Sequence, residues 1–228
     1  WPFSWAIKYM SQRIDHLTYL GDYTKRAISQ SVTAQAAAKM VKIAPGIDTD
    51  HFAPVESYQL RAELNLTDKK VIVSVGRLVH RKGQDILIEA MPEITRHIPN
   101  AHILMIGEGP YRSYLENRVK ALQLEDQVTF IGRLQYQELP QYICVGDLFV
   151  MPSRSRLAGL EVEGLGIVYL EASACGLAVI AGNSGGAPDA VIDGTTGVVV
   201  DGTSNQQISA AAIELLTDLP KAKAMGTA

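Results

Sequence analysis

The chain has 228 residues, and its 21 basic and 24 acidic side chains give a formal net charge of −3. A composition of 47% hydrophobic and 20% charged residues is typical of one globular domain with part of another, and it excludes disordered, collagen-like and disulfide-scaffold proteins. The slight acidic excess argues against general binding to DNA or RNA. Two cysteines, Cys144 and Cys175, stand far apart and outside any Cys-x-x-Cys spacing, which indicates packed free thiols rather than a disulfide framework or a zinc site.

The first 45 residues differ in pattern from the rest of the chain. We expect a strand from His16 to Leu20, a helix that begins at Asp22, and a strand from Val41 to Ala44 that leads into the turn Pro45-Gly46. This succession is typical of the end of an α/β lobe followed by a linker. We therefore expect a boundary at residues 45 and 46, with a second domain over residues 46–228.

The aromatic start of the chain has two interpretations. Trp1, Phe3 and Trp5 either contact a membrane interface or pack on a lobe that precedes them. The longest apolar stretch, from Gly166 to Gly182, is interrupted by Glu171 and is shorter than the ~20 residues that a spanning helix needs. We expect a cytoplasmic protein, with peripheral contact at the inner face of the cell membrane as one interpretation.

From Lys70 onward, short apolar runs alternate with segments of helical spacing. The runs are continuously apolar, which is typical of strands that are buried on both faces of a parallel sheet. Apolar residues recur at the helical period in the segments from Tyr111 to Leu122 and from Ile208 to Leu216. The expected fold class is therefore α/β, a doubly wound parallel sheet that binds ligands at the carboxyl ends of its strands. The six expected strands are Val71–Val75, His102–Ile106, Val128–Ile131, Leu148–Met151, Ala178–Ala181 and Val198–Val200.

The loop after the first of these strands is strongly basic. It follows Gly76 and carries Arg77, Arg81 and Lys82. A planar guanidinium and a compact ammonium suit two adjacent phosphates, so we expect a diphosphate to bind here. The alternative is a solvated basic loop. His80 in the same loop is expected to be a surface residue rather than a catalytic one.

The loop after the fourth strand is the most informative part of the sequence. Gly164 and Gly166 allow the backbone to approach a ligand, and the helix that they open presents its N–H groups and positive dipole end. Glu171 lies ~7 Å along that helix from Gly166. Glu163 and Glu171 are thus offered to different parts of one ligand, such as hydroxyl-rich groups that flank a diphosphate. The alternative is that both carboxylates are helix-cap and surface charges. The apolar neighbours of Glu171 argue against this alternative, because an unpaired charge among them is energetically costly.

Two further glycine turns lie at the same edge. Gly107-Glu108-Gly109 begins a dinucleotide-like pattern, but Arg112 occupies the position of the third glycine, so the simpler interpretation is a tight turn. The segment from Gly182 to Asp189 follows the fifth strand, and we expect Pro188 and Asp189 in the first turn of a helix.

These motifs resemble the donor-binding lobe of retaining family-4 glycosyltransferases of the two-lobed GT-B fold. The resemblance rests on Arg77 with Lys82 five positions on, on the seven residues between Glu163 and Glu171, and on Gly185-Gly186-Ala187-Pro188. It extends from about residue 42 to the end of the sequence.

Two longer segments, Arg81–Asp85 and Arg154–Ala172, look most like bacterial phosphatidylinositol monomannoside mannosyltransferases, which use GDP-mannose. The resemblance implies that residues 1–45 are a remnant of an N-terminal acceptor-side lobe and that residues 46–228 are the donor-binding domain. Asp189 stands where Glu is usual and His80 where Pro is common, and neither departure removes an expected ligand contact.

The resemblance also implies roles for individual residues. Arg77 and Lys82 would hold the diphosphate and Glu163 the hydroxyls of the donor sugar, and these three are the expected catalytic residues. Glu171 would hold the ribose. The other expected donor-binding residues supply backbone groups or border the base beside Gly132, and they are Gly76, Arg133, Gly164, Leu165, Gly166, Ile167 and Val168.

The expected function is transfer of a hexose with retention, mannose from GDP-mannose, to a glycolipid acceptor such as a phosphatidylinositol mannoside. We expect no cofactor and no metal ion, because cations of the protein would stabilise the departing diphosphate. The expected partners are the nucleotide-sugar donor and a lipid-linked or glycosidic acceptor, without nucleic acid. Two alternatives stay open, a nucleotide-sugar epimerase of the same fold and an inactive nucleotide-sugar binding module. Without a first lobe, the chain itself is expected to be inactive.

Overall fold

The computed structural model describes residues 4–228 and divides along the chain into two compact units, the first ending at Gly46 and the second beginning at Ile47. The division falls one residue beyond the boundary expected from the sequence. The assignment of the first unit to an acceptor-side lobe stays a prediction.

The first unit is built on two short parallel strands. Strand β1 (Leu17–Tyr19) pairs with β2 (Met40–Lys42), with Leu17 opposite Met40. Helix α2 (Asp22–Ser29) begins at Asp22 as expected, whereas β2 ends two residues before the expected Ala44. The remaining helices of this unit are α1 (Ser4–Ser11) and α3 (Ala34–Ala37).

The aromatic start of the chain is described only in part. Trp1 and Phe3 lie outside the described residues, and Trp5 is 71% exposed. Across residues 4–228, the helices are all too short or too polar to cross a membrane. The expected contact with a membrane interface stays a prediction.

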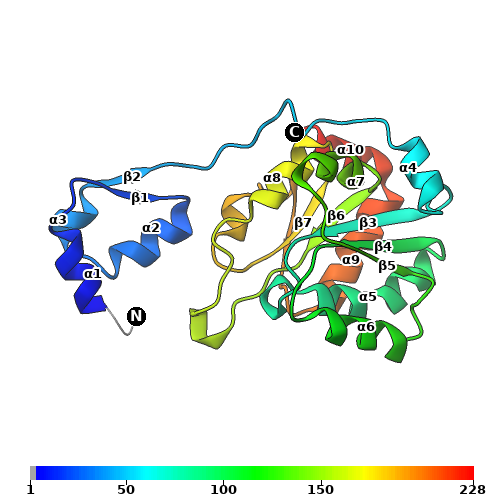
Figure 1. Ribbon diagram of the computed structural model, residues 1–228, viewed down its shortest axis with the longest axis horizontal. Coiled ribbons are helices and arrows are strands. Elements are labelled where there is room, and N and C mark those ends of the chain that lie inside the picture. Colours follow the sequence, from blue (N-terminus) through cyan, green and yellow to red (C-terminus); the bar gives the residue numbers. More distant parts are fainter. Residues whose placement is uncertain (1–3) are drawn as a thin grey trace. The chain divides into compact units, whose positions relative to one another are not determined.

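The second unit is built on a six-stranded sheet in the order β5-β4-β3-β6-β7-β8 (Figure 1). All neighbouring strands are parallel. The order reverses between β3 and β6, which is the switch point where ligands bind in doubly wound sheets. The expected fold class is thus confirmed, and each expected strand overlaps an observed one. The strands are β3 (Lys70–Val75), β4 (Ala101–Ile106), β5 (Val128–Gly132), β6 (Leu148–Met151), β7 (Val179–Gly182) and β8 (Gly197–Val200).

Helices cover both faces of this sheet. Figure 1 shows α5 and α6 on one side of the strands and α7 and α8 on the other. Helix α5 buries Leu87, Met91 and Ile94 at helical spacing, which gives it an apolar stripe toward the sheet. The core on that side is formed with α5 (Gln84–His97), α6 (Arg112–Ala121), α9 (Asn205–Thr217) and α10 (Leu219–Gly226). The opposite core is formed with α4 (Tyr58–Glu63), α7 (Leu139–Cys144) and α8 (Ile167–Ala174).

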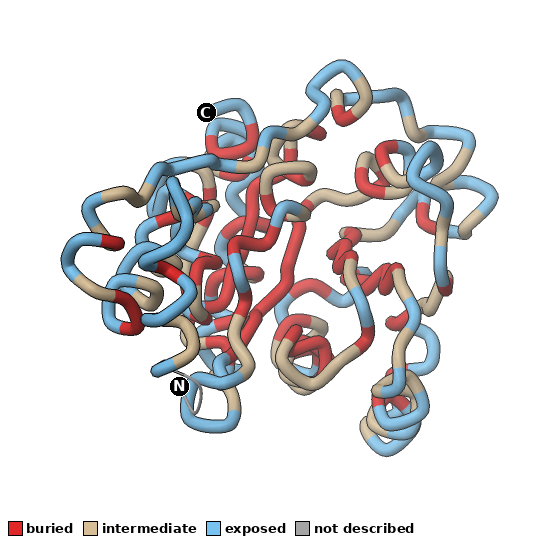
Figure 2. The backbone as a smooth tube through the Cα atoms, turned by 60° about the vertical axis from the view of Figure 1, so that its left-hand side comes forward, coloured by how far each residue is buried: buried red, intermediate tan, exposed pale blue. Residues whose placement is uncertain are grey.

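Burial follows the strands, as Figure 2 shows. Every residue of β4, β6 and β7 is buried, because side chains on both faces of these strands meet helices. These three strands all lie inside the sheet, whereas β5 and β8, at its edges, are only partly buried. The sheet forms a rigid base from which the loops at its carboxyl edge project.

One expected helix does not form. Pro188 and Asp189 lie in a single 3-10 turn, Ala187–Asp189, rather than in the first turn of an α-helix. The 3-10 turn ends at Asp189, and a further turn follows at Gly194, which has a φ of 75°. The chain then enters β8 directly.

The glycine turn after β7 packs against the loop after β6. The N–H of Gly186 donates to the carbonyl oxygen of Glu163 at 2.8 Å. An ideal Cβ on Gly186 would lie 2.1 Å from the carbonyl oxygen of Gly164. The absence of a side chain at Gly186 therefore permits the two loops to touch.

We expect Gly186→Ala to lower the free energy of unfolding by about 1 to 3 kcal/mol, because the added methyl group must displace the Gly164 carbonyl. Gly164→Ala is the matched control, since a Cβ there meets no atom within 4 Å. Urea unfolding at equilibrium measures both variants. Equal stability of the two would contradict the close packing of these loops.

Candidate active site

Three charged side chains meet between the loops that follow β3 and β6. The Nζ atom of Lys82 lies 2.6 Å from Oε2 of Glu163, and the Arg81 guanidinium lies 2.8 Å from the same oxygen. Lys82 and Glu163 are buried, at 8% and 7% exposure, and Arg81 is partly exposed. One buried carboxylate thus holds two cations at the place where the sequence predicts a diphosphate.

Two glycines lie beside this contact, at distances where even a Cβ would be in ordinary van der Waals contact. An ideal Cβ on Gly76 would lie 3.8 Å from Cε of Lys82, and one on Gly166 would lie 3.5 Å from Cγ of Glu163. Burial lowers the pKa of Lys82 from its ordinary value, and the adjacent Glu163 carboxylate opposes that shift. A lysine held with so little water interacts strongly with a negative charge that reaches it.

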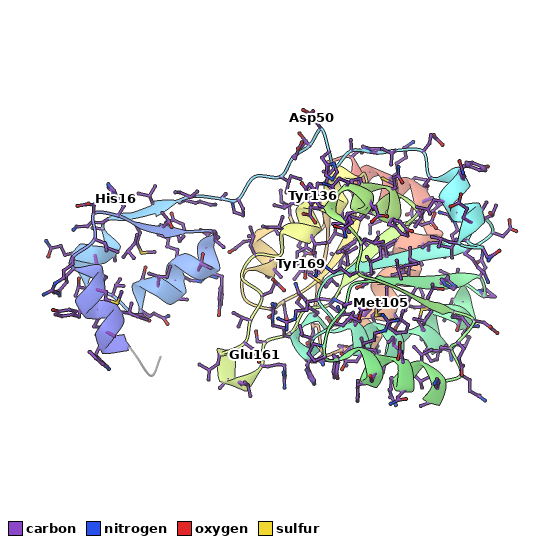
Figure 3. All side chains as sticks on the ribbon, in the orientation of Figure 1. His16, Asp50, Met105, Tyr136, Glu161 and Tyr169 are labelled. Atoms are coloured by element: carbon purple, nitrogen blue, oxygen red, sulfur yellow. The ribbon has the colours of Figure 1, made fainter. Side chains whose placement is uncertain are left out.

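The start of α8 is fixed by a buried tyrosine. Gly166 precedes the helix with a φ of 80°, and its ideal Cβ would lie 2.4 Å from the ring of Tyr169. The hydroxyl of Tyr169, which Figure 3 labels, donates to the carbonyl oxygen of Met151 at 2.9 Å and lies 2.9 Å from Oγ of Ser153. The ring and its hydroxyl therefore tie the helix start to the end of β6. Sequence reasoning missed Tyr169, although a tyrosine three residues after a helix-opening glycine was a usable signal.

The remaining expected donor-binding positions of this loop form the approach to α8. Gly164 is exposed, Leu165 is buried, Ile167 is 43% exposed and Val168 is half-buried. The first N–H groups of an α-helix have no acceptor within the helix. Those of Ile167 and Val168 are therefore suited to an anion.

A second buried ion pair joins the same two loops. Arg154 lies 2.7 Å from Oδ2 of Asp85, both side chains are 7% exposed, and the Tyr111 hydroxyl donates to the same oxygen at 3.1 Å. The backbone N–H of Arg154 donates to the carbonyl oxygen of Arg81 at 2.8 Å. Sequence reasoning missed Asp85, whose partner lies 69 positions away.

His80 belongs to this network and is not the surface residue that the sequence predicts. It is half-buried, and the Arg154 guanidinium donates to its Nδ1 at 2.7 Å. Burial, followed by the positive charges of Arg154 and Arg156, lowers the pKa of His80. The neutral ring accepts the hydrogen bond, and His80 thereby supports the position of Arg154.

Glu171 lies on α8, beyond the glycine-opened start of the helix, and is half-buried. Burial raises its pKa, and nearby His51 opposes this shift. The His51 ring stacks on Tyr136 with 4.4 Å between centroids, and its Nε2 lies 3.0 Å from the Tyr136 carbonyl oxygen. His51 and Tyr136, which is labelled in Figure 3, carry no local motif, so sequence reasoning did not find them.

Two expected residues take no part in the buried cluster. Arg77 is exposed, and among the ion pairs of residues 4–228 it is Arg81 that joins Lys82 on Glu163. Arg133 is also exposed and follows Gly132, whose ideal Cβ would lie 3.1 Å from the Glu108 carboxylate. The loop after β5 therefore borders the loop after β4.

Metal-binding side chains do not cluster in the part of the chain that the structure describes, where no group of three or more His, Cys, Asp or Glu could hold an ion. The expectation of no metal ion assumed that the sequence has no Asp-x-Asp spacing, and this assumption is wrong, because Asp48-Thr49-Asp50 has it. The Asp48 carboxylate accepts the N–H groups of Asp50 and His51 at 3.1 and 3.0 Å, so it closes a turn. Both cysteines are free thiols, as expected.

The doubly wound parallel sheet, with a basic loop and a glycine-opened helix at its carboxyl edge, has the fold of one lobe of a GT-B protein. Residues 57–228 match the family described as glycosyl transferases group 1, and the chain belongs to this family. The expected resemblance is therefore confirmed.

Individual relatives and structures agree with this assignment. The chain is 44% identical over 225 residues to the GDP-mannose-dependent alpha-(1-6)-phosphatidylinositol monomannoside mannosyltransferase of Mycolicibacterium smegmatis, covering 98% of this chain and 58% of that protein. The structure of Anabaena HepE with UDP and glucose has a TM-score of 0.85 at 23% identity and covers 98% of this chain and 60% of that one. The C-terminal domain of a glycosyl transferase group 1 family protein from Francisella tularensis has a TM-score of 0.68 at 29% identity and covers 80% of this chain and 93% of that one. The chain spans just over half the length of the curated relatives it matches.

Proposed function

We propose that this chain is the donor-binding part of a retaining mannosyltransferase that uses GDP-mannose and a phosphatidylinositol mannoside acceptor. The observation that carries the proposal is the buried contact of Lys82 and Glu163 beside the glycine-opened start of α8. The names of relatives at 40 to 44% identity support the choice of donor and acceptor. An acceptor of this class resides in a membrane, so we expect the enzyme to act at a membrane surface.

The proposed mechanism begins with an exchange of partners at Glu163. In the structure this carboxylate neutralises Lys82 and Arg81. When the donor binds, its diphosphate takes over the two cations, and Glu163 accepts hydrogen bonds from hydroxyls of the sugar. The bond between the anomeric carbon and the phosphate oxygen breaks as the acceptor hydroxyl oxygen bonds to that carbon, and the proton of the hydroxyl passes to an oxygen of the departing diphosphate. Lys82, Arg81, Arg77 and the N–H groups at the start of α8 stabilise the charge on this leaving group.

The identity of the donor's base can be tested by measuring how nucleotides without a sugar change the Tm of this chain. A ligand at ~100 times its Kd stabilises the folded state by ~2.7 kcal/mol, which for a domain of this size raises Tm by roughly 5 to 10 °C. We expect GDP to raise Tm more than UDP or ADP at equal concentration. Equal shifts for the three nucleotides would contradict the choice of guanine.

Removal of each of the two carboxylates, Glu163 and Glu171, is expected to change ligand affinity in a different way. Glu171→Ala removes the proposed ribose contact, so it should weaken GDP and GDP-mannose about equally. Glu163→Ala removes the sugar contact and also frees Lys82, so it should erase the advantage of GDP-mannose over GDP without weakening GDP. Calorimetric titration of both ligands measures this split.

The matched control is Glu125→Ala, an exposed carboxylate in the loop after α6. It should leave both affinities unchanged. If Glu171→Ala affected only GDP-mannose and Glu163→Ala affected both ligands, the two assignments would have to be exchanged.

A further inference from the structure

A buried serine in the turn after β7 holds the backbone of Glu163. Ser184 lies two residues beyond the end of β7, in the glycine turn that packs on the loop after β6, and its exposure is 0%. Its Oγ accepts the backbone N–H of Glu163 at 3.2 Å. The two residues are 21 positions apart in the chain, so the bond forms only when the two loops have packed together.

The same turn holds the carbonyl group of Glu163. The N–H of Gly186 donates to this carbonyl oxygen at 2.8 Å. An ideal Cβ on Gly185 would lie 2.2 Å from the same oxygen, so the turn approaches it as closely as a glycine allows. Both peptide groups of Glu163 are therefore fixed by one turn, the first through Ser184 and the second through Gly186. Only the side chain of Glu163 remains free to rotate.

The Ser184 hydroxyl is itself held in place. The backbone N–H of Ser184 donates to the Gly182 carbonyl oxygen at 2.9 Å, and its carbonyl oxygen accepts the N–H of Ala187 at 3.0 Å. A hydroxyl that accepts an N–H keeps its own proton for a second partner, and Oγ of Ser155 lies 3.2 Å away. Ser184 thus presents to Glu163 an acceptor whose position is set before any ligand binds.

The position of Glu163 matters because its carboxylate changes partners in the proposed mechanism. Without a donor it lies 2.6 Å from Lys82 and 2.8 Å from Arg81. With a donor it accepts hydrogen bonds from sugar hydroxyls, which need O···O distances of about 2.5 to 3.0 Å. A misplacement of about 1 Å can cost on the order of a hundredfold in rate. A fixed backbone lets the side chain turn from one set of partners to the other without losing this precision.

We propose that Ser184 is a positioning residue for the donor sugar, which fixes the peptide of Glu163 so that its carboxylate reaches the sugar hydroxyls. This proposal rests on the proposed function. Ser184 acts on recognition of the sugar rather than of the diphosphate. The reason is that Lys82 and Arg77 belong to the loop after β3, and Tyr169 ties down the start of α8 separately.

The test compares Ser184→Ala with the unmodified chain by calorimetric titration of GDP and of GDP-mannose. The variant leaves the buried N–H of Glu163 without its acceptor, so we expect the advantage of GDP-mannose over GDP to fall about tenfold, with GDP affinity unchanged. Ser184→Cys keeps a weak acceptor of similar size and should retain part of the advantage. The matched control is Ser209→Ala, which removes the hydroxyl of a buried serine of α9 and should change neither affinity.

A second measurement needs no ligand. Hydrogen exchange of the Glu163 amide, followed by NMR, should be slow in the unmodified chain and about tenfold faster or more in Ser184→Ala. Ser209→Ala should leave this rate unchanged even if it lowers the stability of the chain. The exchange rate therefore reports the hold on Glu163 directly and separates it from a general loss of stability.

Three results would overturn the proposal. If Ser184→Ala kept the full advantage of GDP-mannose over GDP, the sugar contact would not depend on Ser184. Equal weakening of both ligands would show a general structural role. Unchanged exchange of the Glu163 amide would show that another group holds it. A chain that binds neither ligand, but in which Ser184→Ala speeds this exchange, would instead contradict the proposed function and with it the role in sugar binding, while the hold on Glu163 would stand.

Discussion

Replacing Lys82 by methionine in the full-length enzyme is expected to lower kcat/KM by about a hundred- to a thousandfold, or on the order of 3 to 4 kcal/mol, the loss typical of one preorganised donor at a site of developing charge. Methionine preserves the apolar stem that packs over Gly76. The ammonium group faces the diphosphate, and the negative charge there grows as the glycosidic bond breaks. Its loss should therefore affect kcat more than the affinity for the donor. Arg77 and Arg81 remain in this variant, which favours the lower end of the range.

Steady-state kinetics with GDP-mannose and a glycolipid acceptor measures the loss. Lys120→Met, an exposed lysine of α6, is the matched control and should keep normal activity. Each enzyme is assayed with and without a chelator, which should change little if protein cations carry the charge. Activity that chelation abolishes and magnesium restores would contradict the metal-free mechanism. A near-normal kcat for Lys82→Met would remove this lysine from the chemical step.

Replacing Asp85 by alanine is expected to destabilise the second unit by about 3 to 5 kcal/mol, because it leaves the buried guanidinium of Arg154 without its carboxylate. The Tyr111 hydroxyl loses its acceptor in the same variant. For a domain of this size the loss corresponds to a decrease in Tm of roughly 6 to 20 °C. Differential scanning calorimetry and urea unfolding measure it.

The comparison variant for this prediction is Glu93→Ala, which breaks the exposed ion pair with Arg96 on α5. Pairs of this kind contribute less than about 1 kcal/mol. If Asp85→Ala proved as stable as Glu93→Ala, the Asp85–Arg154 pair would not be what joins the loops after β3 and β6. The double variant Asp85→Leu with Arg154→Leu should recover much of the stability, since two apolar groups leave no buried charge unpaired. It should still bind GDP less tightly than the unmodified chain, because the loops lose their fixed spacing.

Part of the candidate active site could be predicted from local sequence. Each strand coincides with a short, mainly apolar run, and each candidate functional loop begins where such a run ends. Lys82, Glu163 and Glu171 could therefore be predicted to lie at one edge of the sheet. Helix α8 was recognisable because Gly166 permits the turn that opens it. These features depend on short stretches of chain and on the chemistry of single residues.

The pairing of these side chains depended on the tertiary structure. The sequence predicts three cations in one loop but does not say which of them contacts Glu163. The Asp85–Arg154 pair and the contact of Gly186 with Gly164 fix the paths of the loops. These paths bring Arg81, rather than Arg77, to Glu163. Lys82 and Glu163 lie 81 positions apart, and Asp85 and Arg154 lie 69 apart. No local pattern encodes contacts of this range, because their energy arises from burial that exists only after the loops have packed together. The sequence by itself therefore determined the sheet and the chemical character of its edge. The packing of the loops decided which charged side chains form ion pairs.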